Sequence, residues 1–381
     1  ALYDAKGTKQ MLQHNGELLS DVLNVTEKDQ VFEFHGIYGR PIPALLCDFS
    51  APVKLDYDYT TEQLLGLLKF ADNQFARWDA AQMLFTQELR RNVAHFQQGE
   101  AFDISPDVLT ALAHVLENYE QDIELATLIL TLPKDIEFAE NFKTIDPDGI
   151  YAAREFMLVQ IAEYLKEDLL RIYTHIRLEN YQVTQEDIAL RAMRNLCLSY
   201  LAYTNLGNNV VQKHYNNANN MTDTLAALNM ATKAALPCRD ALLADFEQKW
   251  QHDGLVMDKW FALQATLPDE NVLEIVQALM DHPSFNFNNP NRLRSLVGSF
   301  ANHNLKAFHH ISGSGYRFLT DVLIRLNETN PQVAARLIEP LIRFSRFDAQ
   351  RQTLMKRALE RLSAVEDLSK DLFEKIEKAL Q

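Results

Sequence analysis

The sequence predicts a mainly helical chain, an α-solenoid that follows a short β-rich segment. From Thr60 onward, segments of helical length and periodicity succeed one another with only short breaks. The first 57 residues differ, because they carry β-leaning runs and several prolines. Twelve glycines and twelve prolines in 381 residues are too few for a sheet-rich fold with many tight turns. We therefore expect a minor β segment in front of an all-α remainder.

The β-rich segment is predicted from two stretches. Asp21–Phe34 contains two β-leaning runs around a polar turn. Pro41, Pro43 and Pro52 then exclude helix and allow extended or edge strands. A segment of this length is marginal as an isolated sheet, so we interpret it as part of a larger β domain. We place the domain boundary between residues 57 and 58.

The helical part is predicted to begin with a capped helix at Thr60 and Thr61. Further helices are expected over Ala76–His95, Pro106–Asn118, Ile123–Leu132, Pro147–Asn180, Thr184–Tyr203, Thr222–Ala235, Val256–Leu267, Asn271–Asp281, Arg292–Ala301, Tyr316–Glu328, Gln332–Phe344, Asp348–Leu362 and Leu368–Leu380. Short breaks force consecutive helices into antiparallel pairs. Pairs too numerous for one bundle stack into a curved solenoid.

Charge and cysteine content limit the classes of partner. The chain has 37 Lys and Arg against 52 Asp and Glu, a formal net charge of −15. This balance repels phosphate backbones and anionic lipids, so neither nucleic acid nor a membrane is an expected partner. Cys47, Cys197 and Cys238 are widely spaced in apolar surroundings, which indicates reduced cysteines and a cytoplasmic protein. We find neither a signal peptide nor an apolar stretch long enough to span a bilayer.

Catalytic and metal-binding motifs are not found. No histidine starts an HExxH motif, and the sequence has no phosphate-binding or nucleophile-elbow motif. We interpret His309 and His310 as core or surface histidines, and Gly313 as part of a turn that opens a helix. We therefore expect no catalytic residue and no metal ligand in this chain.

A cysteine and a group of four asparagines each have a functional and a structural interpretation. Cys238 lies just ahead of a helix, where a thiol pKa can be lowered, but no histidine partner is identifiable. An autonomous hydrolase built on Cys238 is thus a minor hypothesis beside a packed cysteine. The asparagines at 216, 217, 219 and 220 form either a loop with a helix cap or a loop that faces a ligand.

A polar stripe in the segment Pro331–Phe344 is the most suggestive feature. Its members recur at three- and four-residue intervals, hence on one helix face: Gln332, Arg336, Glu339 and Arg343. The opposite face is apolar and is predicted to be buried: Val333, Leu337, Leu341 and Phe344. Arg294 lies on another helix. A solvated face explains the stripe, and so does a pair of guanidinium groups that binds a carboxylate or a peptide carbonyl.

Many runs of the sequence resemble, in order, the C-terminal region of the bacterial aminopeptidase N family. They include PIPALLCDFSAPVKLDY, FARWDAAQ, NNANNMTDTLAAL, LPCRDALL, GLVMDKWFALQA, NPNRLRSLVGSFA, GSGYRFLTDVL, NPQVAARLIEPLIR and DLSKDLFEKIEKAL. This family consists of zinc metallo-aminopeptidases of the gluzincin type. The resemblance implies a four-domain enzyme. Residues 1–57 would be the C-terminal part of its β-sandwich, and residues 58–381 its right-handed helical superhelix, an armadillo- or HEAT-like α-solenoid.

The resemblance also implies a role for the helical part. In the family it closes over the zinc site, limits access and contacts the peptide beyond its first residue. By motif, Arg294, Gln332 and Arg336 would face that chamber and bind the peptide. The family's HExxH motif is absent from this sequence, so zinc belongs to the parent enzyme and the chain is expected to be inactive alone. The implied partners are the catalytic and N-terminal domains of the same enzyme and peptide substrates, in a monomer. The alternative is a free-standing α-solenoid that binds a partner protein without catalysis.

Overall fold

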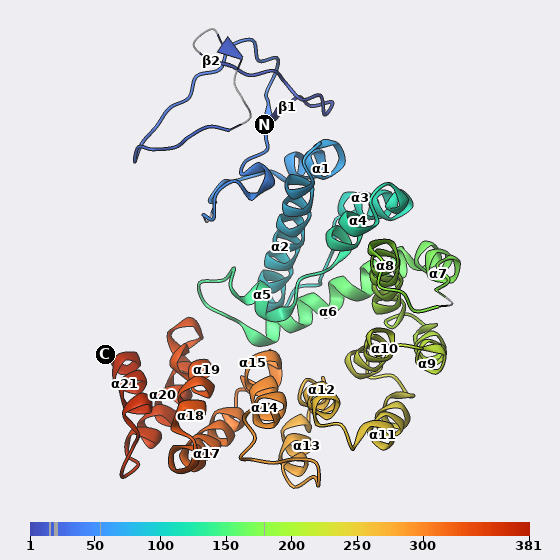
Figure 1. Cartoon of the computed structure of the whole chain (residues 1–381). Coiled ribbons are helices and arrows are strands. Elements are labelled where there is room, and N and C mark those ends of the chain that lie inside the picture. Colours follow the sequence, from blue (N-terminus) through green and yellow to red (C-terminus); the bar gives the residue numbers. More distant parts are fainter. Residues whose placement is uncertain (15–16, 19–21, 54, 179) are drawn as a thin grey trace. The chain divides into compact units, whose positions relative to one another are not determined.

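The computed structural model describes residues 1–14, 17–18, 22–53, 55–178 and 180–381 (Figure 1). Helices dominate the chain, as predicted, and the strands of the described residues are four short segments near the N-terminus. The contacts divide the chain into two compact units. Unit 1 comprises residues 1–91, 103–133 and 182–196, and unit 2 comprises residues 92–102, 134–181 and 197–381. No helix of the described residues is long and apolar enough to cross a membrane.

Unit 1 contains the β segment. Strand β1 (Leu2–Tyr3) pairs antiparallel with β4 (Ile42–Pro43), and β2 (Gln13–His14) pairs antiparallel with β3 (Glu17–Leu18). The prediction of strands within Asp21–Phe34 is wrong for residues 22–34, which form no ladder, and Asp21 lies outside the described residues. A strand needs a hydrogen-bonded neighbouring strand, and the structure assigns residues 22–34 to no strand. Val31 is accordingly 90% exposed.

The helices of unit 1 begin at the predicted position. The Thr60 hydroxyl accepts a hydrogen bond from the amide of Gln63, and the Gln63 side-chain oxygen accepts one from the amide of Thr60. The elements are α1 (Thr61–Phe70), α2 (Gln74–Gln98) as far as Arg91, α3 (Pro106–Glu117), η2 (Tyr119–Gln121), α4 (Ile123–Leu130) and α8 (Gln185–Leu201) as far as Leu196. The β segment packs on α1, and just ahead of this helix the Tyr59 hydroxyl donates to the Pro43 carbonyl at 2.9 Å.

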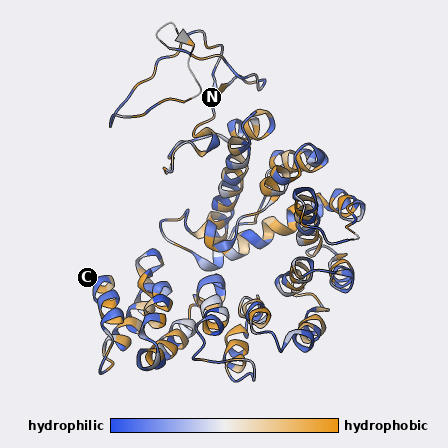
Figure 2. Cartoon of the chain, viewed as in Figure 1, coloured by the Kyte–Doolittle hydropathy of each residue, from blue (hydrophilic) through white to orange (hydrophobic). Residues whose placement is uncertain are grey.

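Unit 2 is a series of helices in which neighbours along the chain pack on one another. They are α5 (Asp135–Ala139), α6 (Pro147–Tyr164), α7 (Lys166–His175), α9 (Gly207–Asn217), α10 (Met221–Lys233), α11 (Arg239–Trp250), α12 (Gly254–Ala265), α13 (Val272–Leu279), α14 (Pro290–Leu293), η3 (Arg294–Gly298), α15 (Ser299–His303), α16 (Leu305–Phe308), α17 (Ser314–Thr329), α18 (Pro331–Leu337), α19 (Glu339–Ile342), η4 (Phe344–Arg346), α20 (Ala349–Ser363) and α21 (Lys370–Leu380). The pairs α9–α10, α11–α12 and α17–α18 are examples of this packing. Hydrophilic and hydrophobic residues alternate around these helices, as expected when one face is buried (Figure 2).

Two predicted helices of unit 2 are interrupted. The segment predicted as Pro147–Asn180 breaks at Leu165 into α6 and α7. The segment predicted as Gln332–Phe344 ends its first helix at Leu337 and restarts at Glu339. Pro340 causes this second break, because it has no amide hydrogen to donate to the Arg336 carbonyl four residues earlier.

Unit 2 also joins segments that are distant in sequence. Ile145, between α5 and α6, forms a parallel bridge with Phe347, and its amide donates to the Arg346 carbonyl at 2.7 Å. Arg346 in turn donates to the Phe142 carbonyl at 2.8 Å. The Glu140 carboxylate pairs with Arg343 and Arg346. We call this set of contacts between residues 140–148 and 343–351 the clasp.

Candidate functional site

The three predicted binding residues lie on two segments that start in the same way. Asn289 and Asn330 each precede a proline that opens a helix, α14 and α18 respectively. The Asn289 side chain accepts from the Asn291 amide at 2.9 Å, and that of Asn330 accepts from the Val333 amide at 3.2 Å. Each asparagine satisfies an amide that has no partner within the helix, and each proline occupies a position that needs no amide hydrogen. The sequence thus determines where both segments begin.

The two segments are in contact at Gly298. Arg294 opens the π-helical turn η3, and Gly298 closes it. A Cβ atom at Gly298 would lie 3.5 Å from the Arg294 Cβ and 3.5 Å from Leu337 Cδ2. Leu337 of α18 therefore packs on the turn that carries Arg294, and Arg336 is its neighbour in the chain. Single π-turns of this kind are frequent at functional sites.

All three predicted residues are exposed, and two of them have no side-chain partner among the residues that the structure describes. Arg294 donates to the Asn291 side chain at 3.1 Å, which holds one edge of its guanidinium group. Within the described part of the chain, neither Arg336 nor Gln332 makes a side-chain hydrogen bond or ion pair. Their donors are thus available to a ligand. Guanidinium groups bind carboxylates and carbonyl oxygens through two parallel N–H donors.

The structure divides the predicted polar stripe. Glu339 and Arg343 do not continue the helix of Gln332 and Arg336, because that helix is interrupted at Ile338. Glu339 pairs with Lys375 of α21, and Arg343 pairs with Glu140. Half of the stripe therefore makes ion pairs within the protein. The sequence carried a signal for this division, since Pro340 interrupts the stripe. The partners lie too far away along the chain for sequence reasoning to find them.

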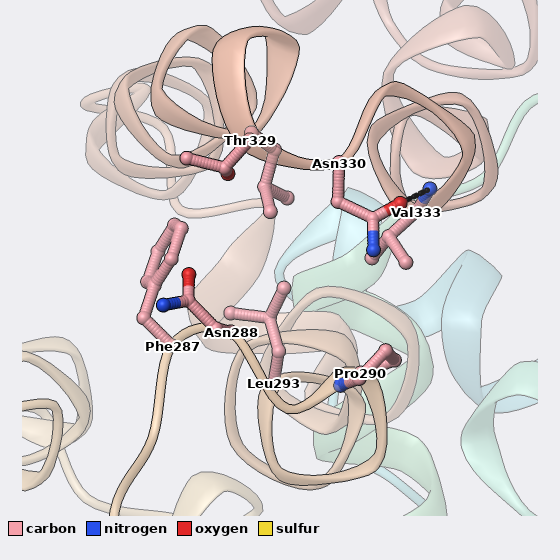
Figure 3. A pocket seen from close by; sticks show the side chains of 8 residues that line it. Phe287, Asn288, Pro290, Leu293, Thr329, Asn330 and Val333 are labelled. Atoms are coloured by element: carbon pink, nitrogen blue, oxygen red, sulfur yellow. Dashed lines mark hydrogen bonds between the residues drawn. The ribbon is translucent and has the colours of Figure 1, made fainter.

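The predicted apolar side of the stripe is confirmed as core. Val333, Leu337, Leu341 and Phe344 are all buried. On this side, the ends of α14, α17 and α18 surround a pocket of about 100 Å³ (Figure 3). Its lining is Phe287, Asn288, Pro290, Leu293, Leu326, Thr329, Asn330 and Val333. Asn330 presents its amide nitrogen while its oxygen is held by the Val333 amide (Figure 3). Of the polar stripe, Gln332 adjoins this lining in sequence, next to Val333.

The other candidate positions prove structural. Cys238 precedes α11 as predicted, but burial raises the pKa of its thiol, opposite to what a nucleophile needs. Asn220 caps α10, whereas Asn216 and Asn217 belong to α9, a helix that the sequence analysis did not predict. Gly313 opens α17 with a positive φ of 69°, as the turn interpretation requires.

The paired histidines His309 and His310 also make contacts within the protein. His309 is buried and hydrogen-bonded to the Tyr316 hydroxyl, whereas His310 is exposed and hydrogen-bonded to the Ser312 hydroxyl. Both match their interpretation as core or surface residues. Across the residues described, no group of three or more His, Cys, Asp or Glu side chains is arranged to hold a metal ion.

Serial packing of paired helices in unit 2 defines a protein of the helical-repeat class. The chain belongs to the family described as a domain of unknown function with ARM repeats (DUF3458_C), whose model matches residues 61–381. A second model, a domain of unknown function with an Ig-like fold (DUF3458), matches residues 1–58. The predicted helical-repeat class is thus confirmed, whereas the domain boundary after residue 57 stays a prediction.

The chain is also similar to aminopeptidases, both in sequence and in structure. The chain is 88% identical to Aminopeptidase N of Haemophilus influenzae and 51% identical to Aminopeptidase N of Escherichia coli, in each case over 100% of the chain and 44% of the relative. A crystal structure of Legionella pneumophila aminopeptidase A in complex with aspartic acid superposes with a TM-score of 0.87 at 28% identity. That match covers 100% of this chain and 44% of the other. The chain therefore spans less than half the length of these relatives, and the resemblance to the C-terminal region of aminopeptidase N is confirmed.

Proposed function

We propose that this chain is the C-terminal, substrate-binding part of a zinc-dependent aminopeptidase that removes N-terminal residues from peptides. The observation that carries the proposal is the 88% identity to an aminopeptidase N along the whole chain. The relatives' name supplies the activity, and the exposed guanidinium groups of Arg294 and Arg336 supply a means of holding a peptide. A free-standing scaffold is not favoured, because the match to the aminopeptidases extends through the β segment as well as the helices.

The role of the helices is to bind the peptide and limit access. Arg336 has no side-chain partner among the described residues, and Arg294 is held on one edge by Asn291. Two guanidinium groups thus project from adjoining segments. Such groups bind the carbonyls or the terminal carboxylate of a peptide and position it without touching the reacting atoms. Gln332, on the same helix as Arg336, adds an amide that both donates and accepts. The partners would be the other domains of the same polypeptide, in a cytoplasmic monomer.

Zinc is assigned to the parent enzyme and not to these residues. The described part of the chain has no set of His, Cys, Asp or Glu side chains that fits a metal ion. A zinc site needs three or four such ligands at close range. No step of the reaction is therefore assigned to this chain.

Replacing the arginines in the full-length enzyme tests the peptide-binding role. Arg336→Ala and Arg294→Ala should each raise KM for tri- to pentapeptides by about tenfold or more, since a charge-assisted hydrogen bond contributes about 1.5–3 kcal/mol. The kcat for amides of single amino acids should not change. Arg357→Ala is a matched control, because Arg357 is an exposed arginine on α20. Unchanged KM for every peptide length in both variants would remove the assigned role.

A further inference from the structure

The segment that carries Arg294 is short and depends on its neighbours for its orientation. Helix α14 has four residues, and the turn η3 that follows has five. A helix of this length is not stable by itself, so contacts with other elements must hold it. Leu337 of α18 lies against η3 at Gly298. The other neighbour is α12, which contacts both α14 and η3.

Arg292 connects α14 to α12 through three contacts. Its Nη2 donates to the Gly254 carbonyl at 3.0 Å, and its Nη1 forms an ion pair with Asp258 Oδ1 at 3.4 Å. The centre of the guanidinium group lies 5.1 Å from the centre of the Phe261 ring. These three partners recur at four- and three-residue intervals, so they form one face of α12. Arg292 is therefore anchored on a single face of this helix.

The anchor is buried, whereas the arginine two positions later is exposed. Arg292 is 6% exposed, and the side chain of its partner Asp258 is 17% exposed. Two residues along a helical chain differ in direction by about 200°, so Arg292 points into the protein and Arg294 points away from it. The position of Arg292 on α12 thus sets the direction in which Arg294 projects.

Short polar contacts connect the two arginines. The Asn289 side chain accepts from the amides of Asn291 and Arg292, at 2.9 Å and 3.3 Å. The Asn291 side chain in turn accepts from Arg294 Nη1 at 3.1 Å. One turn of backbone therefore carries both the buried anchor and the hydrogen bond that holds Arg294. A shift of Arg292 relative to α12 would move that whole turn.

We propose that Arg292 is a positioning residue for peptide binding, which acts by fixing the orientation of Arg294 from α12. This inference rests on the proposed function, because that function assigns Arg294 to the peptide. Arg292 is buried and so acts through Arg294, not by contact with the substrate. Orientation matters because a guanidinium group binds a carboxylate or carbonyl oxygen through N–H donors of fixed direction.

Kinetics of the full-length enzyme with Arg292→Met test this role, since methionine keeps an unbranched side chain and removes the charge. We expect KM for tri- to pentapeptides to rise by about five- to tenfold, while kcat for amides of single amino acids stays within about twofold. Arg292→Lys retains a cation for Asp258 and should restore KM to within about threefold. In the double variant with Arg294→Ala, KM should be no higher than in Arg294→Ala alone, because the anchor acts only through Arg294.

Arg351→Met is the matched control, because Arg351 is also a buried arginine paired with aspartates but belongs to the clasp. It should leave KM for peptides unchanged. Urea unfolding shows whether each variant is folded. If Arg292→Met does not fold, Asp258→Asn tests the same anchor, because it removes the charge that pairs with Arg292 and keeps the shape of the side chain. This variant should also raise KM for peptides.

The outcomes separate this inference from the proposed function. Unchanged KM in the folded anchor variant, beside a raised KM in Arg294→Ala, would overturn the role of Arg292 and leave the proposed function in place. Increases that multiply in the double variant, or an equal increase in Arg351→Met, would also overturn it, because the effect would then not pass through Arg294. Unchanged KM in Arg294→Ala itself would refute the peptide-binding role on which the inference rests.

Discussion

His309 is a buried imidazole that the fold keeps neutral. Its Nδ1 lies 3.0 Å from the Tyr316 hydroxyl, and its ring stacks on Phe347 with centroids 4.1 Å apart. Burial, assisted by the nearby Arg351 cation, lowers the pKa of His309 to about 3. The ordinary histidine pKa is about 6.5, so the unfolded chain takes up a proton in a range where the folded chain does not.

This difference predicts a loss of stability in mild acid. The contribution of His309 is fully present above about pH 6.5 and is lost as the pH falls toward 3, at about 1.4 kcal/mol per pH unit. Between about pH 7 and pH 5 it amounts to about 2 kcal/mol. Urea unfolding of His309→Asn should therefore show a weaker pH dependence than the unsubstituted chain. His310→Asn, at the exposed neighbouring position, should retain the full dependence, and equal slopes for all three chains would contradict the assignment.

Residue types and spacing could predict part of the candidate site. The four-residue interval between Gln332 and Arg336 predicts a shared exposed face, and both side chains are exposed on α18. The same interval rule failed for Glu339 and Arg343, because the helix is interrupted at Ile338. Their partners Lys375 and Glu140 come from distant segments. The spacing of residues indicates which face of a helix they share. Their ion-pair partners depend on which helices pack together in the fold, and spacing does not indicate that.

At the scale of elements, the clasp joins the α5–α6 connection to α20. Arg351 is buried there and its guanidinium group contacts three acceptors, the His309 carbonyl at 2.7 Å, Asp348 at 2.8 Å and Asp148. Asp148 and Arg351 are 203 residues apart in sequence. A buried arginine with two carboxylates holds such distant segments together only while every partner is present.

Removing this arginine should destabilise unit 2. Arg351→Met should cost about 2–3 kcal/mol, less than for a fully buried ion pair because both carboxylates are partly exposed. Arg357→Met, on an exposed position of the same helix, should change stability by no more than about 0.5 kcal/mol. The urea midpoint of each chain measures the effect. Equal midpoints for the two variants would show that the clasp contributes little.

Most elements could be predicted from periodicity and caps, and the failures have specific causes. Helix α9 was missed because its sequence is rich in asparagine, which favours turns in isolation, whereas Val211 and Tyr215 bury one face of it. The break at Pro340 follows from local chemistry and was predictable in principle. The strands expected within 22–34 depended on pairing partners, which no local pattern specifies.

At the scale of the whole molecule, the chain combines an Ig-like segment with ARM-type helices and is similar to aminopeptidases along its full length. These helices offer exposed guanidinium groups but, in the described residues, no cluster of metal ligands. We propose that this chain contributes substrate binding and that other parts of the enzyme carry out the cleavage reaction.

An activity assay of the purified 381-residue chain tests this division most directly. The chain is incubated with amino-acid amides and short peptides, with and without added zinc, beside the full-length enzyme as a positive control. We predict no cleavage above background by the chain and cleavage by the full-length enzyme. Zinc-dependent release of amino acids by the chain, at a rate comparable to that of the full-length enzyme, would contradict the account.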